Sequence, residues 1–264
     1  MKKTNILAIA NEKGGVGKTT TAFNLAAGLA EHGKKVLLCS LDKQHNLNDY
    51  VGCKLDTNPT ISELCYYTVA GMNFNGVDAI RKIEDEKIDY IPSSDMLSSV
   101  NSILATASDS QGVLKKLFSR QEFLGYEYII LDCKPELDLF VVNALVAATG
   151  LIIPVQAEKF SFDGLQGILS TYERIRATSN PQLEIIGILV TMLTKTTMAT
   201  SVTTALQVKY SDYLFDTKIS RAVEAVNSTA LKKSLIRMNG KLGQQYKSVT
   251  QEVITRCEGG VNNG

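Results

Sequence analysis

Two lysines, three glycines and two threonines stand together near the start of the chain, in the segment NEKGGVGKTT at residues 11–20. A phosphate group binds where several backbone N–H groups converge at the N-terminus of a helix, and glycines let the backbone come that close. Lys18 can place its charge on the β and γ phosphates, and the Thr19 hydroxyl can ligate a magnesium ion. The segment therefore predicts a loop that binds a nucleotide with Mg²⁺.

The loop departs from the usual phosphate-loop pattern, which has a glycine five residues before Gly17, where this chain has Glu12. Lys13, at the start of the loop, is poorly placed to reach the phosphates of its own nucleotide alone. Thr20 can add a further phosphate contact. The residues expected to bind the nucleotide are Lys13, Gly14, Gly15, Val16, Gly17, Lys18, Thr19 and Thr20.

The elements that must position this loop are visible as continuous apolar runs separated by helix-like segments. These runs cover residues 5–10, 35–41, 128–132, 151–155 and 184–190. Continuous rather than alternating apolar runs are typical of buried parallel strands. The sequence predicts an α/β fold of the P-loop NTPase type, a doubly wound and mostly parallel sheet with helices on both faces. Residues 1–258 are expected to form one domain and residues 259–264 a disordered tail.

Two aspartates follow predicted strands. Asp42 can orient the water that attacks the γ-phosphate, and Asp132, at the end of an apolar strand, can hold Mg²⁺ through a water. A strand-end aspartate that caps the next turn is the alternative for Asp42. A chance acid at the end of a buried strand is the alternative for Asp132.

These motifs resemble the deviant Walker-A ATPases, and nearly the whole chain is similar to their ParA/Soj branch, the chromosome and plasmid partitioning proteins. The resemblance implies an ATP-sandwich homodimer in which Lys13 reaches the nucleotide of the partner subunit, so that the catalytic residues are Lys13 and Asp42. It also implies slow ATP hydrolysis stimulated by a ParB-like centromere-binding protein. The ATP-bound dimer is expected to bind non-specific DNA, which places the protein in the cytoplasm on the nucleoid.

Four residues depart from the pattern of that family. Ser40, Lys43 and His45 replace an aspartate, a proline and a glycine of its acidic motif, and Lys134 lies where the family tends to have two prolines and a small residue. These changes bear on the hydrolysis rate and on switch motion rather than on nucleotide binding. A nucleotide-binding regulator that hydrolyses little therefore stays open as an alternative.

The net charge of +1 does not by itself indicate nucleic-acid binding, but the charged residues are unevenly distributed along the chain. Residues 209–247 contain eight basic and three acidic side chains. A basic patch binds the phosphate backbone without reading sequence. The candidates for DNA binding are Arg221, Lys218, Lys232, Lys233 and Arg237, with Arg221 first because it aligns with an Ile-Pro-Arg segment of the family. Solvated helix faces are the alternative for the individual lysines.

Other classes of function find less support. The five cysteines are odd in number and form no C-x-x-C pair, which argues against a disulfide framework or a zinc site. The apolar run near the N-terminus is too short for a signal peptide. A MinD-like membrane switch needs a basic amphipathic C-terminal helix, but residues 248–257 have a weak apolar stripe and little positive charge, so no membrane contact is expected. A positioning ATPase for a protein cargo stays open.

Overall fold

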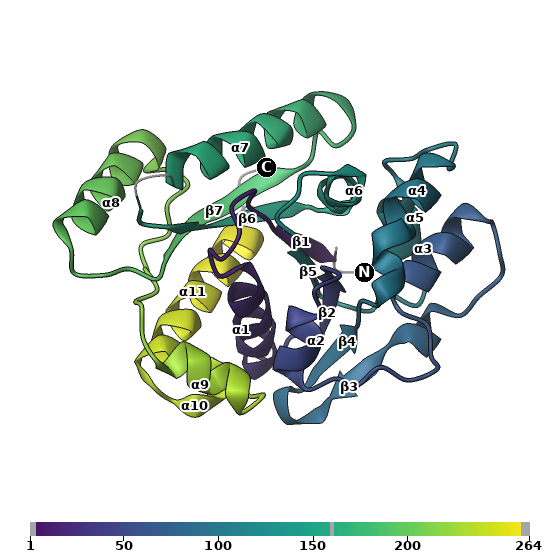
Figure 1. The fold of residues 1–264 in the computed structure, drawn as a ribbon, viewed down its shortest axis with the longest axis horizontal. Coiled ribbons are helices and arrows are strands. Elements are labelled where there is room, and N and C mark those ends of the chain that lie inside the picture. The colour runs from purple at the N-terminus through teal and green to yellow at the C-terminus, as the bar shows by residue number, and fades with distance from the viewer. Residues whose placement is uncertain (1–3, 159–160, 260–264) are drawn as a thin grey trace.

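The computed structural model describes residues 4–158 and 161–259. Its centre is a seven-stranded sheet in the order β3-β4-β2-β5-β1-β6-β7, parallel except for β3 (Figure 1). The strands are β1 (Asn5–Ile9), β2 (Val36–Leu41), β3 (Arg81–Ile83), β4 (Ile88–Ile91), β5 (Tyr128–Cys133), β6 (Gly150–Gln156) and β7 (Glu184–Thr191). The prediction of a doubly wound, mostly parallel sheet is confirmed.

Helices cover both faces of the sheet (Figure 1). The described α-helices are α1 (Lys18–Glu31), α2 (Asn46–Val51), α3 (Ile61–Val69), α4 (Val100–Ala105), α5 (Val113–Phe118), α6 (Leu139–Ala147), α7 (Ser161–Thr178), α8 (Thr197–Tyr210), α9 (Glu224–Ala230), α10 (Leu235–Met238) and α11 (Lys241–Glu258). Alternate residues of β1 separate the two cores. Leu7 and Ile9 pack in the core with α1, α2, α10 and α11, whereas Ala8 and Ala10 pack in the core with α3 to α7.

The register of the central strands determines where the functional residues meet. Asp132 pairs with Ile9 of β1 on one side and with Ser40 of β2 on the other. The chain leaves β1 into the glycine-rich loop and leaves β2 into Asp42. Because the carboxyl ends of parallel strands meet at one edge of the sheet, the loop and both aspartates converge there.

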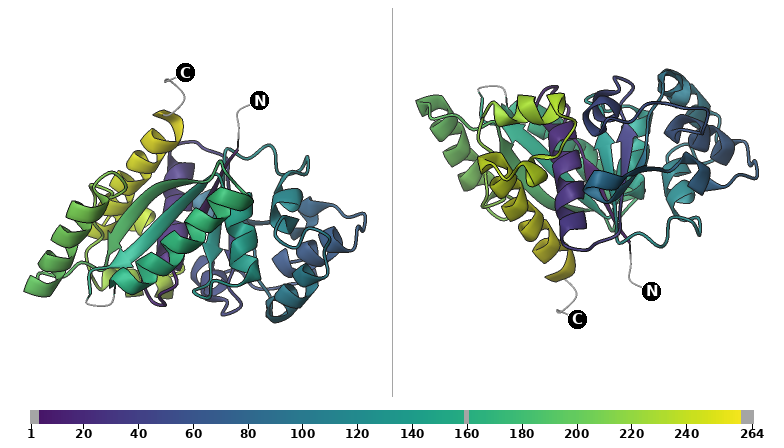
Figure 2. Two further views of the ribbon diagram at one scale, coloured as in Figure 1. Left: turned by 90° about the horizontal axis from the view of Figure 1, so that it is seen from above. Right: turned by 90° about the horizontal axis from the view of Figure 1, so that it is seen from below.

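The last helix, α11, runs beside α1 on one face of the sheet (Figure 2). The contact is close because Gly28 of α1 faces Thr250 of α11, and a methyl group at Gly28 would come within 2.3 Å of the Thr250 hydroxyl oxygen. The apolar stripe of α11 faces inward here, with Val249 and Val253 buried. The helix α11 therefore packs directly against α1, the helix that follows the phosphate loop.

Two strands were not predicted from the sequence. β4 has only four residues, and β3, with three, pairs antiparallel to it at the edge of the sheet. The Arg-Lys-Ile sequence of β3 lacks a continuous apolar run, because an edge strand is only partly buried. The predicted tail lies outside the described residues except for Gly259.

Candidate nucleotide-binding site

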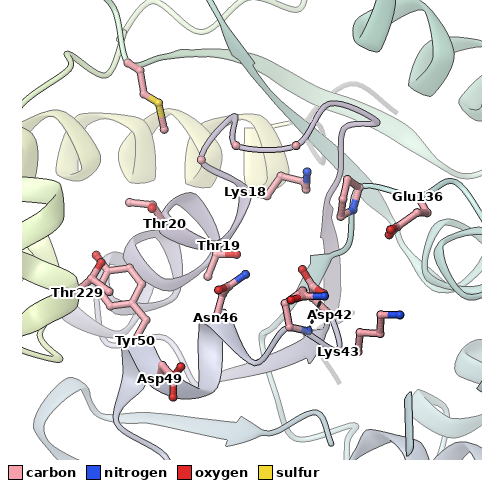
Figure 3. A pocket seen from close by; sticks show the side chains of 16 residues that line it. Lys18, Thr19, Thr20, Asp42, Lys43, Asn46, Asp49, Tyr50, Glu136 and Thr229 are labelled. Carbon is pink, nitrogen blue, oxygen red and sulfur yellow. Dashed lines mark hydrogen bonds between the residues drawn. The ribbon is translucent and has the colours of Figure 1, made fainter. Parts of the chain in front are cut away.

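A pocket of about 630 Å³ opens where β1, β2 and β5 end (Figure 3). It combines residues from the glycine-rich loop, the segment after β2, the segment after β5, and two later parts of the chain. Its lining residues are Gly14, Gly15, Gly17, Lys18, Thr19, Thr20, Asp42, Lys43, Gln44, Asn46, Asp49, Tyr50, Pro135, Glu136, Met192 and Thr229. Most of the residues predicted to bind the nucleotide therefore lie around one cavity.

The loop before α1 has a conformation that requires glycine. Gly15 and Gly17 have φ angles of 73° and 86°, in the left-handed region that side chains disfavour. Gly17 is the N-cap of α1, and the first turn of α1 contains no acidic residue. The helix therefore presents unpaired N–H groups and a positive dipole end to the pocket, which is the arrangement that binds phosphate.

Val16 contributes to the loop through its backbone. Its side chain is buried, and its carbonyl accepts a hydrogen bond from the Thr191 hydroxyl at the end of β7 over 2.8 Å. The contact ties the loop to the far half of the sheet. Of the residues predicted to bind the nucleotide, Val16 and Lys13 do not line the pocket.

Lys18 is the cation inside the pocket. Its side chain is mostly buried, and its ammonium donates to the carbonyl of Lys13 over 2.9 Å. Burial lowers the pKa of Lys18, while the carboxylates of Asp132, Asp42 and Glu136 act in the opposite direction. A phosphate at the loop would add negative charge to this site and keep the ammonium protonated.

Lys13 is held differently. Its ammonium lies 3.2 Å from a carboxylate oxygen of Glu158, just after β6, and its backbone N–H donates to the Asn11 side chain over 2.9 Å. Asn11 is buried and donates in turn to the Pro154 carbonyl on β6 over 2.7 Å. Gly164 of α7 also packs closely here, since a Cβ there would lie 3.0 Å from that of Lys13. The start of the loop is therefore fixed to β6 and α7.

Asp132 lies just behind the pocket and is 1% exposed. Burial raises its pKa to about 7, the Asp42 carboxylate adds to that rise, and the Thr19 hydroxyl and Lys18 oppose it. In the described part of the chain, neither carboxylate oxygen has a partner that meets hydrogen-bond geometry, although the Thr19 hydroxyl is near. A buried carboxylate without a partner calls for a ligand. Beside a threonine hydroxyl, it fits a hydrated Mg²⁺ ion.

Asp42 is half-buried and lines the pocket. One oxygen of its carboxylate accepts a hydrogen bond from the Gln44 backbone N–H over 3.0 Å, which fixes the side chain in a turn. Its own carbonyl accepts from the Ser93 hydroxyl over 2.7 Å. Figure 3 shows Asp42 across the cavity from the Lys18 side of the loop. Asp42 therefore stabilises the turn after β2, as the alternative interpretation of this residue predicted. It also lines the pocket in which a phosphate would lie.

Three of the four residues that depart from the family pattern have identifiable contacts, and the fourth, Lys43, lines the pocket. Ser40 is buried, and its hydroxyl lies 3.0 Å from that of Ser93. His45 has a φ angle of 57°, a conformation natural for the glycine that it replaces, and its ring lies 3.6 Å from Asp95. Lys134 forms an ion pair with Asp138, the N-cap of α6. Each departure is accommodated without closing the pocket.

Sequence reasoning missed several pocket residues. Asn46, Asp49 and Tyr50 come from α2, Met192 follows β7, and Thr229 lies on α9. Asn46 ends the acidic motif at residues 40–46, a signal that was available, whereas the other four stand in no motif and had no local signal. Their place in the pocket follows from the packing of α2 against α1 and of α9 against α2, and from the position of Met192 directly after β7.

The candidates for DNA binding are not equivalent. Arg221 and Lys232 are exposed, Lys233 is half-buried, and among the described residues none of these three has an acidic partner within 4.0 Å. The Lys218 ammonium donates to the Asp216 carbonyl. The guanidinium of Arg237 lies 3.4 Å from Asp85 and 3.9 Å from Glu86. Arg221, Lys232 and Lys233 are therefore better placed to contact phosphate than Arg237.

Comparison with known proteins agrees with this site. A family model described as an AAA domain matches residues 4–185. The chain is 32% identical over 97% of its length to the chromosome-partitioning ATPase Soj of Thermus thermophilus, of which it covers 98%. It is 35% identical over 95% of its length to the chromosome partitioning protein ParA of Caulobacter vibrioides, of which it covers 94%.

A solved structure shows the same fold. Cobyrinic acid a,c-diamide synthase from Mycobacterium smegmatis, with bound ADP and magnesium, has a TM-score of 0.83 and 26% identity, over 97% of this chain and 96% of that one. Four features agree with one another: the phosphate loop at residues 11–20, Asp42 after β2 with Asp132 near the end of β5, the parallel sheet, and the identity over nearly the full length. This chain belongs to the ParA/Soj family of P-loop ATPases.

Proposed function

We propose that this chain is a dimerising switch ATPase that binds ATP with Mg²⁺, binds DNA without sequence preference in the ATP state, and hydrolyses ATP slowly. In this role it segregates plasmid, chromosome or mobile-element DNA with a ParB-like centromere-binding partner. The phosphate loop, the unpartnered Asp132 and a structural neighbour with bound ADP and magnesium support the nucleotide and the metal.

One observation carries the proposal of a dimer. The two lysines of the loop differ in position, since Lys18 lines the pocket and Lys13 does not. The Lys13 ammonium instead pairs with Glu158 at the outer end of β6. A lysine in this position can act on a nucleotide of a second subunit once that subunit covers the pocket, in the way that an arginine finger acts in trans.

The residues of this chain would divide the chemistry among them. The N–H groups of the loop and Lys18 would bind the β and γ phosphates, and Thr19 and Asp132 would hold the magnesium ion, Asp132 through a water. Bound Mg²⁺ would neutralise charge that develops on the phosphate oxygens. Asp42 orients the attacking water, and Lys13 of the partner subunit adds the last positive charge. Without a stimulating partner we expect turnover of about 10⁻⁴–10⁻² s⁻¹.

DNA binding rests on the basic C-terminal third of the chain. Arg221, Lys232 and Lys233 have no competing carboxylate among the described residues within 4.0 Å. Such side chains bind the phosphate backbone by releasing counterions, so binding should weaken steeply with salt. We expect the protein to lie in the cytoplasm on the nucleoid.

The membrane-binding alternative loses its structural basis. It requires the apolar stripe of the last helix to be free for lipid, but Val249 and Val253 of α11 are 1% and 0% exposed and pack in the core beside α1. Within residues 4–158 and 161–259, no helix is long and apolar enough to cross a bilayer. A positioning ATPase for a protein cargo would use the same nucleotide site and would differ from a DNA-partition ATPase only in its partner. Identifying that partner distinguishes the two functions.

The proposal is tested by binding to a non-specific DNA duplex at low and moderate salt, with ATP, with ADP, and with ATP on a Lys13→Ala variant. We expect binding only with ATP and with Lys13 present, and weaker binding at higher salt. Size-exclusion chromatography with light scattering on the same samples reports the dimer. Binding that is absent with every nucleotide would overturn the DNA-partition function.

A further inference from the structure

Behind Asp42 lies a closed cluster of buried polar side chains. It joins the end of β2, the end of β4 and the helix α2, and it faces the core rather than the pocket. Its members are Ser40, Asn48, Tyr90 and Ser93, each 3% exposed or less. Hydrogen bonds this deep in a protein are costly to leave unmade, so the cluster has one preferred arrangement.

Counting hydrogens fixes the direction of the bonds around Ser93. Its hydroxyl has a single hydrogen, and the Asp42 carbonyl, 2.7 Å away, can only accept. The hydrogen of Ser93 therefore goes to Asp42. The Ser40 hydroxyl, 3.0 Å from Ser93, must then be the donor in that pair. The chain of donation runs from Ser40 to Ser93 to the backbone of Asp42.

Ser93 is itself held on both sides of its backbone. The side-chain amide of Asn48 donates to the Ser93 carbonyl over 2.8 Å, and its oxygen accepts from the Ser93 N–H over 3.4 Å and from the Tyr90 hydroxyl over 2.5 Å. Asn48 lies on α2, whose residues Asn46 and Asp49 line the pocket. The helix α2, which lines the pocket, is thereby connected through Asn48 to Ser93, the residue that bonds the Asp42 carbonyl.

We propose that Ser93 is a positioning residue for ATP hydrolysis, which holds the backbone of Asp42 so that its carboxylate faces the γ-phosphate. The inference rests on the proposed role of Asp42. Besides Ser93, the described groups offer the Asp42 carbonyl only the His45 N–H, at 3.4 Å. Loss of the Ser93 hydroxyl therefore leaves the start of the segment after β2 held weakly, while the phosphate loop on β1 is untouched.

Ser40 provides a matched control. Ser93→Ala and Ser40→Ala each remove one buried hydroxyl from the same cluster, but only Ser93→Ala breaks the bond to Asp42. A purely structural role for the cluster would make the two variants behave alike. Because a misplacement of about 1 Å can cost roughly 100-fold in rate, we expect Ser93→Ala to lower kcat by about 10- to 100-fold, with the ATP Kd changed less than about threefold. Ser40→Ala, which leaves the bond from Ser93 to Asp42 in place, should lower kcat less than Ser93→Ala does.

The experiment compares kcat, ATP Kd and urea unfolding for the natural protein, Ser93→Ala, Ser40→Ala and Asp42→Ala. Equal kcat values for the two serine variants, or a loss confined to ATP affinity, would overturn the inference. If Asp42→Ala is inactive while Ser93→Ala is fully active, the inference fails and the proposed hydrolysis survives. If Asp42→Ala is fully active, the inference and the proposed role of Asp42 both fail, although hydrolysis itself is then shown. Should Ser93→Ala not fold, Ser93→Cys keeps the size with a weaker donor and should show a smaller loss of kcat than Asp42→Ala.

Discussion

The ammonium of Lys18 donates a hydrogen bond to the backbone carbonyl of Lys13 across 2.9 Å, so the two lysines of the phosphate loop touch within one subunit. Their side chains nevertheless have different surroundings, since Lys18 lines the pocket and Lys13 pairs with Glu158. This difference supports the proposal that Lys18 acts on the nucleotide of its own subunit and Lys13 on that of a second subunit.

This difference predicts that mutation of Lys18 and mutation of Lys13 have different effects, the first on ATP binding and the second on dimerisation. Lys18→Ala should weaken ATP binding by roughly 10- to 100-fold, because it removes a charged hydrogen-bond donor to the phosphates. Lys13→Ala should leave ATP binding by the monomer within about threefold and abolish the ATP-dependent dimer. Titration with a fluorescent ATP analogue at low protein concentration and light scattering at high concentration check the two parts. Equal loss of ATP binding in both variants would contradict the assignment.

Asp132 predicts an unusual dependence of stability on pH in the nucleotide-free protein. Its pKa is raised by burial from 3.8 to about 7, so the folded state binds a proton more tightly than the unfolded chain. Stability from this group is present at low pH and is lost as pH rises toward 7. The stability gained by Asp132→Asn should therefore be larger at about pH 8 than at about pH 5, by more than about 1 kcal/mol.

Urea unfolding in the presence of a chelator measures this difference. Asp212→Asn is the control, because it removes one negative charge from an exposed position away from the pocket. In the same assay, Mg²⁺ with ATP should stabilise the natural protein more than Asp132→Asn, since the amide cannot balance the charge of the metal. A flat difference between pH 5 and pH 8 would contradict the buried, unpartnered carboxylate.

The contact between Gly28 and Thr250 predicts a change of sign between two backgrounds. A methyl group at Gly28 would lie 2.3 Å from the Thr250 hydroxyl oxygen and 3.1 Å from its Cβ and Cγ2 atoms. Gly28→Ala should therefore destabilise the protein by about 1–3 kcal/mol, despite the better helix propensity of alanine. In a Thr250→Gly background, which removes the Cβ as well as the hydroxyl and methyl groups, the clash is relieved, and Gly28→Ala should be neutral or stabilising. Thermal and urea unfolding of the four proteins check the coupling, and additive effects would contradict it.

Much of the fold and the phosphate loop could be predicted from the sequence because the signals are local. Lys18 and Thr19 stand beside the glycines that shape the loop. Asp42 directly follows the apolar strand β2, and Asp132 directly follows the apolar residues of β5. Ser93 could not be predicted, because its role depends on β4 lying next to β2, a pairing between segments about fifty residues apart along the chain. Met192 likewise reaches the pocket only because β7 and the phosphate loop are joined through tertiary contacts.

The basic C-terminal third predicts that Arg221 and Arg237 differ in DNA binding although both are arginines of one segment. Arg221 is exposed and has no acidic partner within 4.0 Å among the described residues, whereas the guanidinium of Arg237 lies 3.4 Å from Asp85. Arg221→Ala should weaken binding of the ATP-bound protein to duplexes of any sequence and lower the slope of log affinity against log salt by about 1. Arg237→Ala should leave that slope unchanged. Fluorescence anisotropy over a series of salt concentrations measures both, and a slope for Arg221→Ala equal to that of the natural protein would show that Arg221 makes no phosphate contact of its own.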